Sequence, residues 1–223
     1  SMFSYCSSVT SLDISNFDTE KVTDMSYMFS YCSHIKSLDF MHFNTEKVTD
    51  MSYMFSYCTD LSSLVLSKFK TENVKNMMYM FAECKGLTSL DISSFSTSKV
   101  SNMRNMFSNC NRLYSLDLSK FNTEKVIDMQ SMCANCSYLW DLLLSPFNTS
   151  EVRDMSFMFQ NCIRIMSIDI SNFRTSKVSN MNSMFDGCYS LTSLNLKNFD
   201  TSLVTDMAYM FRYCQQLTSL NNR

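Results

Sequence analysis

Met2-Phe-Ser-Tyr-Cys6 recurs unchanged at residues 28–32 and again at 54–58, which sets an interval of 26 residues. The interval then holds, with substitutions, to the end of the 223-residue chain, so that about eight and a half copies follow one another. A fixed period of this length is typical of a solenoid, in which each copy stacks on the next and only the stack encloses a core. The sequence therefore predicts a single repeat domain over residues 1–223.

The first half of each copy predicts a short strand. In the second copy Ile35, Leu38, Phe40 and Phe43 fit the pattern L-x-x-L-x-L-x-x-F. The alternation at Leu38 and Phe40 is the period of a strand with one buried face. Strands that recur once per copy of a solenoid pair in parallel, roughly 4.8 Å apart. We expect the solenoid to be right-handed, because crossovers between parallel strands are right-handed.

The second half of each copy predicts a short helix. Its apolar residues recur at intervals of three, three, one and three, here at Val22, Met25, Met28, Phe29 and Cys32. An Asp or Asn, which is a good helix N-cap, precedes the first methionine in every copy, at Asp24, Asp50, Asn76, Asn102, Asp128, Asp154, Asn180 and Asp206. We expect a helix from about Met25 to Tyr31, with a longer helix from Thr19 as the alternative. The predicted fold class is an α/β solenoid with one parallel strand and one short helix per repeat.

The two halves together resemble known repeats. The pattern C-x-x-L-x-x-L-x-L-x-x-F is similar to a leucine-rich repeat, and F-x-T-x-x-V-x-D/N-M-x-x-M-F-x-x-C resembles the 26-residue repeat of mycoplasma lipoproteins and BspA-like bacterial surface proteins. Residues 32–55 carry both patterns through one copy, and the resemblance covers essentially the whole chain. It implies surface exposure and adhesion-type binding, and it supplies no catalytic residues.

Nine of the ten cysteines share one position of the repeat: Cys6, Cys32, Cys58, Cys84, Cys110, Cys136, Cys162, Cys188 and Cys214. Side chains at equivalent positions of stacked copies point in parallel rather than at one another, so we expect a buried, reduced column, with disulfides as the alternative. Zinc is disfavoured, because the chain's only histidines are His34 and His42.

Composition and motifs argue against several functions. A net charge of −2 disfavours nucleic acid, which requires a basic face. No apolar run is long enough to span a bilayer. The sequence has no G-x-S-x-G motif, no glycine-rich phosphate loop and no H-E-x-x-H motif. We therefore predict no catalytic residues, no cofactor and no metal centre.

An acidic stripe follows the outward position of the predicted strands, at Asp13, Asp39, Asp91, Asp117 and Asp169. Val65 and Leu143 interrupt it. Carboxylates on neighbouring copies have the chemistry to hold calcium between them. The favoured alternative is an ordinary solvated strand face.

The position just before the strand changes character in three consecutive copies, where Tyr114, Trp140 and Met166 replace small or polar residues. Nearby positions change as well, namely Arg112, Tyr138, Leu143 and Arg164. Aromatic residues flanked by arginine are the usual composition of a binding hot spot, so these seven residues, the aromatic patch, are the candidate binding site. The alternative is local repacking, in which Trp140 fills volume lost where Cys133 replaces phenylalanine, in a copy that also carries Pro146.

Tyrosines recur at two positions of the predicted helix in the first copies, at Tyr27, Tyr53 and Tyr79 and at Tyr5, Tyr31 and Tyr57. The two sets are four residues apart, which places them on neighbouring faces of a helix. Recent duplication of nearly identical copies is the favoured explanation.

These observations predict a non-enzymatic binding module of a bacterial surface protein, which recognises a host or cell-surface macromolecule through its strand face. A rigid spacer that presents another domain is the alternative. We expect the protein at the cell surface or secreted. The chain begins and ends inside a repeat, so we read it as part of a longer protein without its capping repeats, and we expect its apolar ends, at Val9 and Leu12 and at Leu217 and Leu220, to associate end to end.

Overall fold

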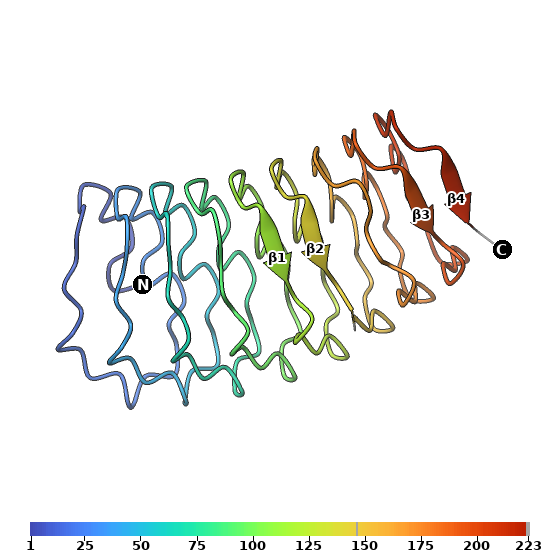
Figure 1. The fold of residues 1–223 in the computed structure, drawn as a ribbon. Coiled ribbons are helices and arrows are strands. Elements are labelled where there is room, and N and C mark those ends of the chain that lie inside the picture. The colour runs from blue at the N-terminus through green and yellow to red at the C-terminus, as the bar shows by residue number, and fades with distance from the viewer. Residues whose placement is uncertain (146, 222–223) are drawn as a thin grey trace.

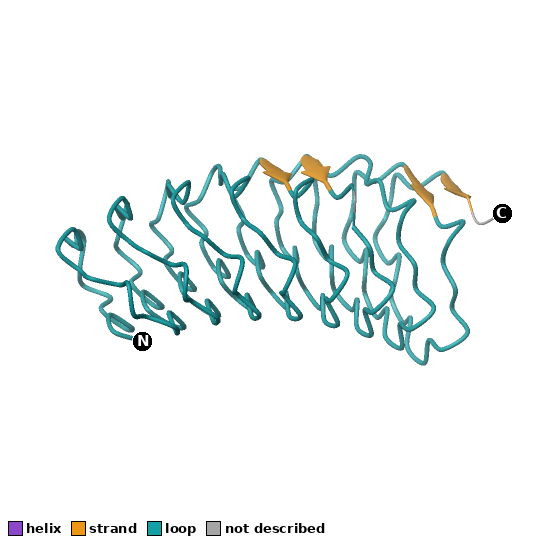
Figure 2. Cartoon of the chain, turned by 90° about the horizontal axis from the view of Figure 1, so that it is seen from below, coloured by secondary structure: helices purple, strands orange, loops and turns teal. Residues whose placement is uncertain are grey.

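The computed structural model describes residues 1–145 and 147–221, which form one elongated stack of coils with one coil per 26-residue repeat (Figure 1). The short strands lie along one face of the stack, the strand face (Figure 2). They are β1 (Ser115–Asp117), β2 (Asp141–Leu143), β3 (Ser193–Asn195) and β4 (Ser219–Asn221). The expected solenoid is present.

Pairing on the strand face is parallel and follows the repeat. β1 pairs with β2 and places Leu116 opposite Leu142, while β3 pairs with β4 and places Leu194 opposite Leu220. Each partner lies 26 residues along the chain. Other coils make only isolated parallel bridges on this face, such as Val65 with Asp91. The predicted parallel direction is therefore confirmed, and so is the strand position in four coils. The expectation of one strand in every repeat is not confirmed, because residues 1–145 and 147–221 contain only these four strands, each of three residues.

The expected helix from Met25 to Tyr31 is wrong, because no helix occurs in residues 1–145 or 147–221. Two positions in this segment have left-handed backbone, Tyr27 at φ 57° and Tyr31 at φ 62°. A right-handed helix of L-residues does not accommodate such angles. The longer helix from Thr19 is excluded for the same reason.

Overlapping β-turns take the place of the helix in a segment that we call the turn ladder, residues 24–32 and their equivalents. Within a coil, the Met28 N–H donates to the Met25 carbonyl at 3.3 Å, and the Cys32 N–H donates to the Phe29 carbonyl at 3.1 Å. The N–H groups that alternate with these donate to the next coil, as Tyr27 does to the Ser52 carbonyl at 2.9 Å and Phe29 to the Met54 carbonyl at 2.9 Å. Parallel bridges run unbroken along this segment from Asp24 to Asp206.

The Asp or Asn at the start of the turn ladder acts locally, as a cap does. The Asp24 Oδ1 accepts the Ser26 N–H at 2.8 Å, and Asn102 accepts the Arg104 N–H at 3.0 Å. This bond to the second following residue defines an Asx turn, which needs no helix after it. The sequence signal was therefore a genuine signal for a side chain that accepts a backbone N–H.

Buried threonines join neighbouring coils. The Thr45 hydroxyl accepts the Lys70 N–H at 2.7 Å and donates to the Lys70 carbonyl at 2.9 Å. The same pair of hydrogen bonds recurs in seven coils, at Thr19, Thr45, Thr71, Thr97, Thr123, Thr149 and Thr175. Each hydroxyl thus satisfies both backbone groups of one residue in the next coil.

The core is built from stacked columns of like residues. The rings of Phe55 and Phe81 stack with centroids 5.7 Å apart. The cysteines from Cys32 to Cys188 are buried and free, as expected. Each thiol also donates to a carbonyl of the preceding coil, as Cys58 does to Phe29 at 3.2 Å. The cysteine column therefore contributes hydrogen bonds between coils as well as packing.

The terminal coils expose positions that the interior coils bury. Met207 is 46% exposed, whereas its equivalent Met181 is fully buried. Met2 is 64% exposed against 7% for Met28. Apolar surface of this kind favours contact between molecules.

The threonine bonds generate a stability prediction. Thr97→Val keeps the volume of the side chain but leaves the Asn122 N–H and carbonyl without their partner. We therefore expect the free energy of unfolding, measured in urea, to fall by about 2–3 kcal/mol. Thr97→Ser is the control, because it keeps the hydroxyl and removes only one methyl group. Its free energy of unfolding should fall by about 1 kcal/mol. Equal midpoints for the two variants would show that the bonds contribute nothing.

The cysteine column generates a prediction on reactivity. Burial raises the pKa of Cys84 and of Cys136 to about 12, so the reactive thiolate is scarce at neutral pH. Titration of the native protein with a thiol reagent should modify few cysteines, and denaturant should release nearly all ten. Because the pKa is raised by folding, this contribution to stability is complete below about pH 8.5, the unfolded pKa, and declines as the pH rises toward 12. Rapid native labelling of the interior cysteines would contradict the assignment.

The exposed terminal coils generate a prediction on association. We expect a weak, concentration-dependent dimer in light scattering, because the faces at Met2 and Met207 are apolar. A chain lengthened by one repeat at each end should lose or move this contact. A dimer that persists unchanged would place the interface elsewhere.

Candidate functional site

The aromatic patch lies on the strand face, beside β1 and β2. Tyr114 directly precedes β1 and Trp140 directly precedes β2, and the Trp140 backbone N–H donates to the Tyr114 carbonyl at 3.0 Å. Met166 occupies the same position one coil further, where its carbonyl accepts the Thr192 N–H at 3.0 Å. The three side chains therefore start from consecutive coils in a single row.

The side chains of this row are open to solvent. Trp140 is 61% exposed and Met166 67%, and Tyr114, Tyr138 and Leu143 are each more than 40% exposed. An indole with this exposure does not fill the space left at Cys133, which is itself completely buried. Repacking around Cys133 thus does not account for Trp140. Pro146, the other change in this copy, lies outside the described residues.

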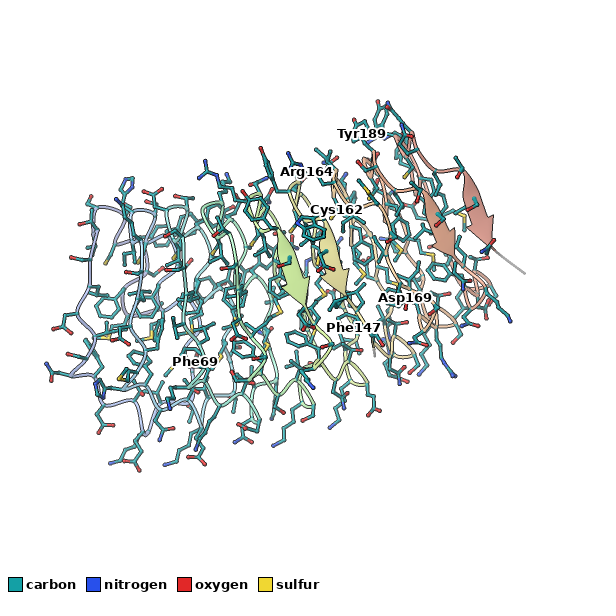
Figure 3. The ribbon with its side chains drawn as sticks, in the orientation of Figure 1. Phe69, Phe147, Cys162, Arg164, Asp169 and Tyr189 are labelled. Carbon is teal, nitrogen blue, oxygen red and sulfur yellow. The ribbon has the colours of Figure 1, made fainter. Side chains whose placement is uncertain are left out.

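Direct contacts hold part of the patch in place. The rings of Tyr114 and Tyr138 meet edge to face, with centroids 6.1 Å apart. The guanidinium of Arg164 lies over the Tyr138 ring, 4.2 Å from its centroid. Figure 3 shows Arg164 at the upper edge of the coils, the edge on which Tyr189 also lies. Edge-to-face and cation–π contacts favour one relative orientation of Tyr114, Tyr138 and Arg164.

Arg112 is exposed but has a different environment from Arg164. It borders a shallow depression of about 500 Å³, together with Lys36, Lys85 and Gly86 from preceding coils. Arg112, a residue of the aromatic patch, thus also borders a basic surface that the sequence pattern did not reveal.

The acidic stripe has a local role in the loops that follow the strand positions. The Asp169 Oδ1 accepts the Ser171 hydroxyl at 2.6 Å and the Ser171 N–H at 3.0 Å, and these bonds lower the pKa of Asp169. The backbone bond recurs at Asp13, Asp39, Asp91 and Asp117. No group of three or more His, Cys, Asp or Glu residues in the described part of the chain could hold a metal ion. The stripe therefore fits a solvated strand face with turn-forming carboxylates.

The tyrosines form two stacks on the turn ladder rather than on helix faces. Ring centroids are 4.4 Å apart between Tyr27 and Tyr53, and 4.3 Å apart between Tyr31 and Tyr57. Both positions have positive φ in coil after coil. Other coils place Asn105, Asn109, Asn135, Asn161 and Gly187 there. Asn and Gly favour this conformation, and that was the signal available in the sequence for turns instead of a helix.

Comparison with solved structures finds bacterial leucine-rich repeat proteins. A leucine rich cell surface protein from Faecalibacterium prausnitzii is 20% identical, with a TM-score of 0.45, over 98% of this chain and 67% of that chain. A leucine-rich repeat protein from Bacteroides ovatus is 18% identical, with a TM-score of 0.38, over 98% and 62%. One from Eubacterium ventriosum is 16% identical, with a TM-score of 0.45, and there the match spans 46% of the other chain.

Comparison with sequences identifies the family. No curated protein matches the chain.

A search of the described residues for a helix long and apolar enough to cross a membrane finds none. The family described as "Mycoplasma protein of unknown function, DUF285" matches residues 1–39, 31–143 and 140–222. The chain therefore belongs to this family, in agreement with the resemblance of its repeats to those of mycoplasma surface proteins.

Proposed function

We propose that the chain is a non-enzymatic binding module of a bacterial surface protein and that it recognises a protein on a host or bacterial cell surface through the aromatic patch. The observation that carries this proposal is the row of exposed Tyr114, Trp140 and Met166 on consecutive coils, beside the contact of Tyr138 with Arg164. Tyr, Trp and Arg are the residues most enriched at binding hot spots. Repeats of the kind found in mycoplasma and BspA-like surface proteins support the surface location.

The architecture suits recognition of a macromolecule better than capture of a small ligand. The strand face is extended, and the aromatic patch crosses several coils instead of lining a deep cavity. Interfaces between proteins are broad, with an apolar centre and a polar rim. The acidic carboxylates of Asp117 and Asp169 flank the patch and would lie at such a rim.

A rigid spacer remains the second candidate. The continuous core, with columns such as the cysteines repeated from coil to coil, would suit a stalk equally well. A spacer gives no reason for exposed Trp140 and Met166 at a position where most other coils have Thr, Ser or Lys. A photo-crosslinking experiment separates the two functions.

In this experiment a photoreactive phenylalanine replaces Trp140 in one protein and Thr10 in a control. Thr10 is exposed and occupies the equivalent position in the first coil. The two proteins therefore differ only in the coil that carries the photoreactive residue. The proteins are irradiated on intact cells, and the adducts are identified by mass spectrometry. A defined adduct from position 140 alone supports the binding function. Equal labelling from both positions, or none, supports the spacer.

The patch also generates a quantitative prediction for the partner so identified. Trp140→Ala should weaken its binding by about 2 kcal/mol, roughly thirtyfold, because the indole supplies a large and ordered contact area. The urea midpoint should not change, since the side chain is 61% exposed. Val65→Ala is the matched control, an exposed apolar residue of the strand face outside the patch. Equal effects of the two substitutions would remove the patch as the contact site.

A further inference from the structure

A basic depression lies next to the aromatic patch, across the coils that precede it. Its volume is about 500 Å³, and its lining residues are Lys36, Thr59, Asp60, Ser62, Lys85, Gly86 and Arg112. We call it the basic pocket. Arg112 borders it on the side of the aromatic patch, because Tyr138 follows Arg112 at the equivalent position of the next coil. The two surfaces therefore adjoin.

Gly86 lies at a close contact between two of the coils that line the pocket. Its neighbours at the equivalent position, Asp60 and Arg112, both carry side chains. A Cβ atom at residue 86 would lie 2.7 Å from the Thr59 carbonyl oxygen, which is closer than Cβ atoms approach backbone, and 3.1 Å from that of Leu61. The close packing of these coils thus favours glycine at residue 86, so the pocket is lined there by backbone alone.

The charges around the basic pocket are mostly positive. Lys36, Lys85 and Arg112 face one carboxylate, Asp60, in a chain whose net charge is −2. Two of the four charges already have partners: Lys85 pairs with Glu83 at 3.0 Å, and Asp60 contacts the His34 ring at 3.0 Å. Within residues 1–145 and 147–221, Lys36 and Arg112 have no carboxylate within 4 Å. These two cations are available to an anionic ligand.

We propose that the basic pocket holds acidic side chains of the protein that the aromatic patch recognises, so that the partner carries an acidic segment beside an apolar one. This inference rests on the proposed binding function for the identity of the partner. A guanidinium such as that of Arg112 binds a carboxylate through two parallel hydrogen bonds, and Lys36 adds a second positive charge. A peptide offers both carboxylates and apolar side chains for exposed Trp140 and Met166, whereas a sulfated glycan has sugar faces that can stack on an indole but no apolar side chain to pack against Met166.

The test measures binding of fluorescein-labelled hexaglutamate by fluorescence anisotropy. The wild-type protein should bind hexaglutamate but not labelled hexaglutamine, and binding should weaken with added salt. The variant with both Lys36→Gln and Arg112→Gln should bind roughly fivefold or more weakly, since one exposed ion pair contributes up to about 1 kcal/mol. Lys125→Gln is the control, since it removes one positive charge at an exposed site outside the pocket. Circular dichroism checks that each variant is folded.

The outcomes separate this proposal from the binding function itself. Equal affinity of the double variant and Lys125→Gln for hexaglutamate would overturn the pocket, and so would failure of the wild type to bind. A heparin hexasaccharide that binds through Lys36 and Arg112 while hexaglutamate does not would assign the pocket to sulfated sugars and overturn the acidic peptide. Trp140→Ala should leave hexaglutamate binding intact. Equal affinity of the partner crosslinked from position 140 for the wild type and for the double variant at Lys36 and Arg112 is a separate outcome. That result would leave the proposed binding function in place and would contradict the role of the basic pocket.

Discussion

Hydrogen bonding between residues about 26 apart is the constraint on which the rest of this structure depends. With no helix in the described residues and strands of only three residues, a coil has few ways to satisfy its own backbone. The turn ladder, the threonine hydroxyls and the cysteine thiols each donate hydrogen bonds to carbonyls of a neighbouring coil, as Tyr27, Thr45 and Cys58 illustrate. An insertion of one residue would misalign all three sets at once, which accounts for an unbroken period over the whole chain.

The sequence was sufficient to predict the solenoid, the parallel strands and the core columns, because these depend on the repeat and on apolar spacing. It misled on the helix for a physical reason. Overlapping β-turns close bonds to the third preceding residue, so they also bring Met25, Met28 and Phe29 to one side at intervals of three or four. Apolar spacing does not distinguish the two structures, but backbone preference does. Asn135 and Gly187 at positions of positive φ carried that information.

The candidate site was predictable to the extent that it follows columns. Residues one repeat apart become neighbours, and so Arg164 could be expected beside Tyr138, where the structure places it at 4.2 Å from the ring. The basic pocket could not be anticipated in this way. Its lining combines different positions of the repeat from several coils, including Lys36 and Arg112. Only a three-dimensional arrangement shows that these positions surround one space.

The repeat also separates stability from recognition. At the row that contains Trp140, the bonds between coils are made by the backbone: Trp140 donates to Tyr114, and Thr192 donates to Met166. The same bond joins Thr218 to Thr192, where the side chains are small and polar. Since the backbone carries the contact, the exposed side chain is free to vary without loss of the fold. The core columns have no such freedom, because each buried residue packs against its equivalents in both neighbouring coils. Departures from the repeat on the exposed row are therefore where selection for a partner can act.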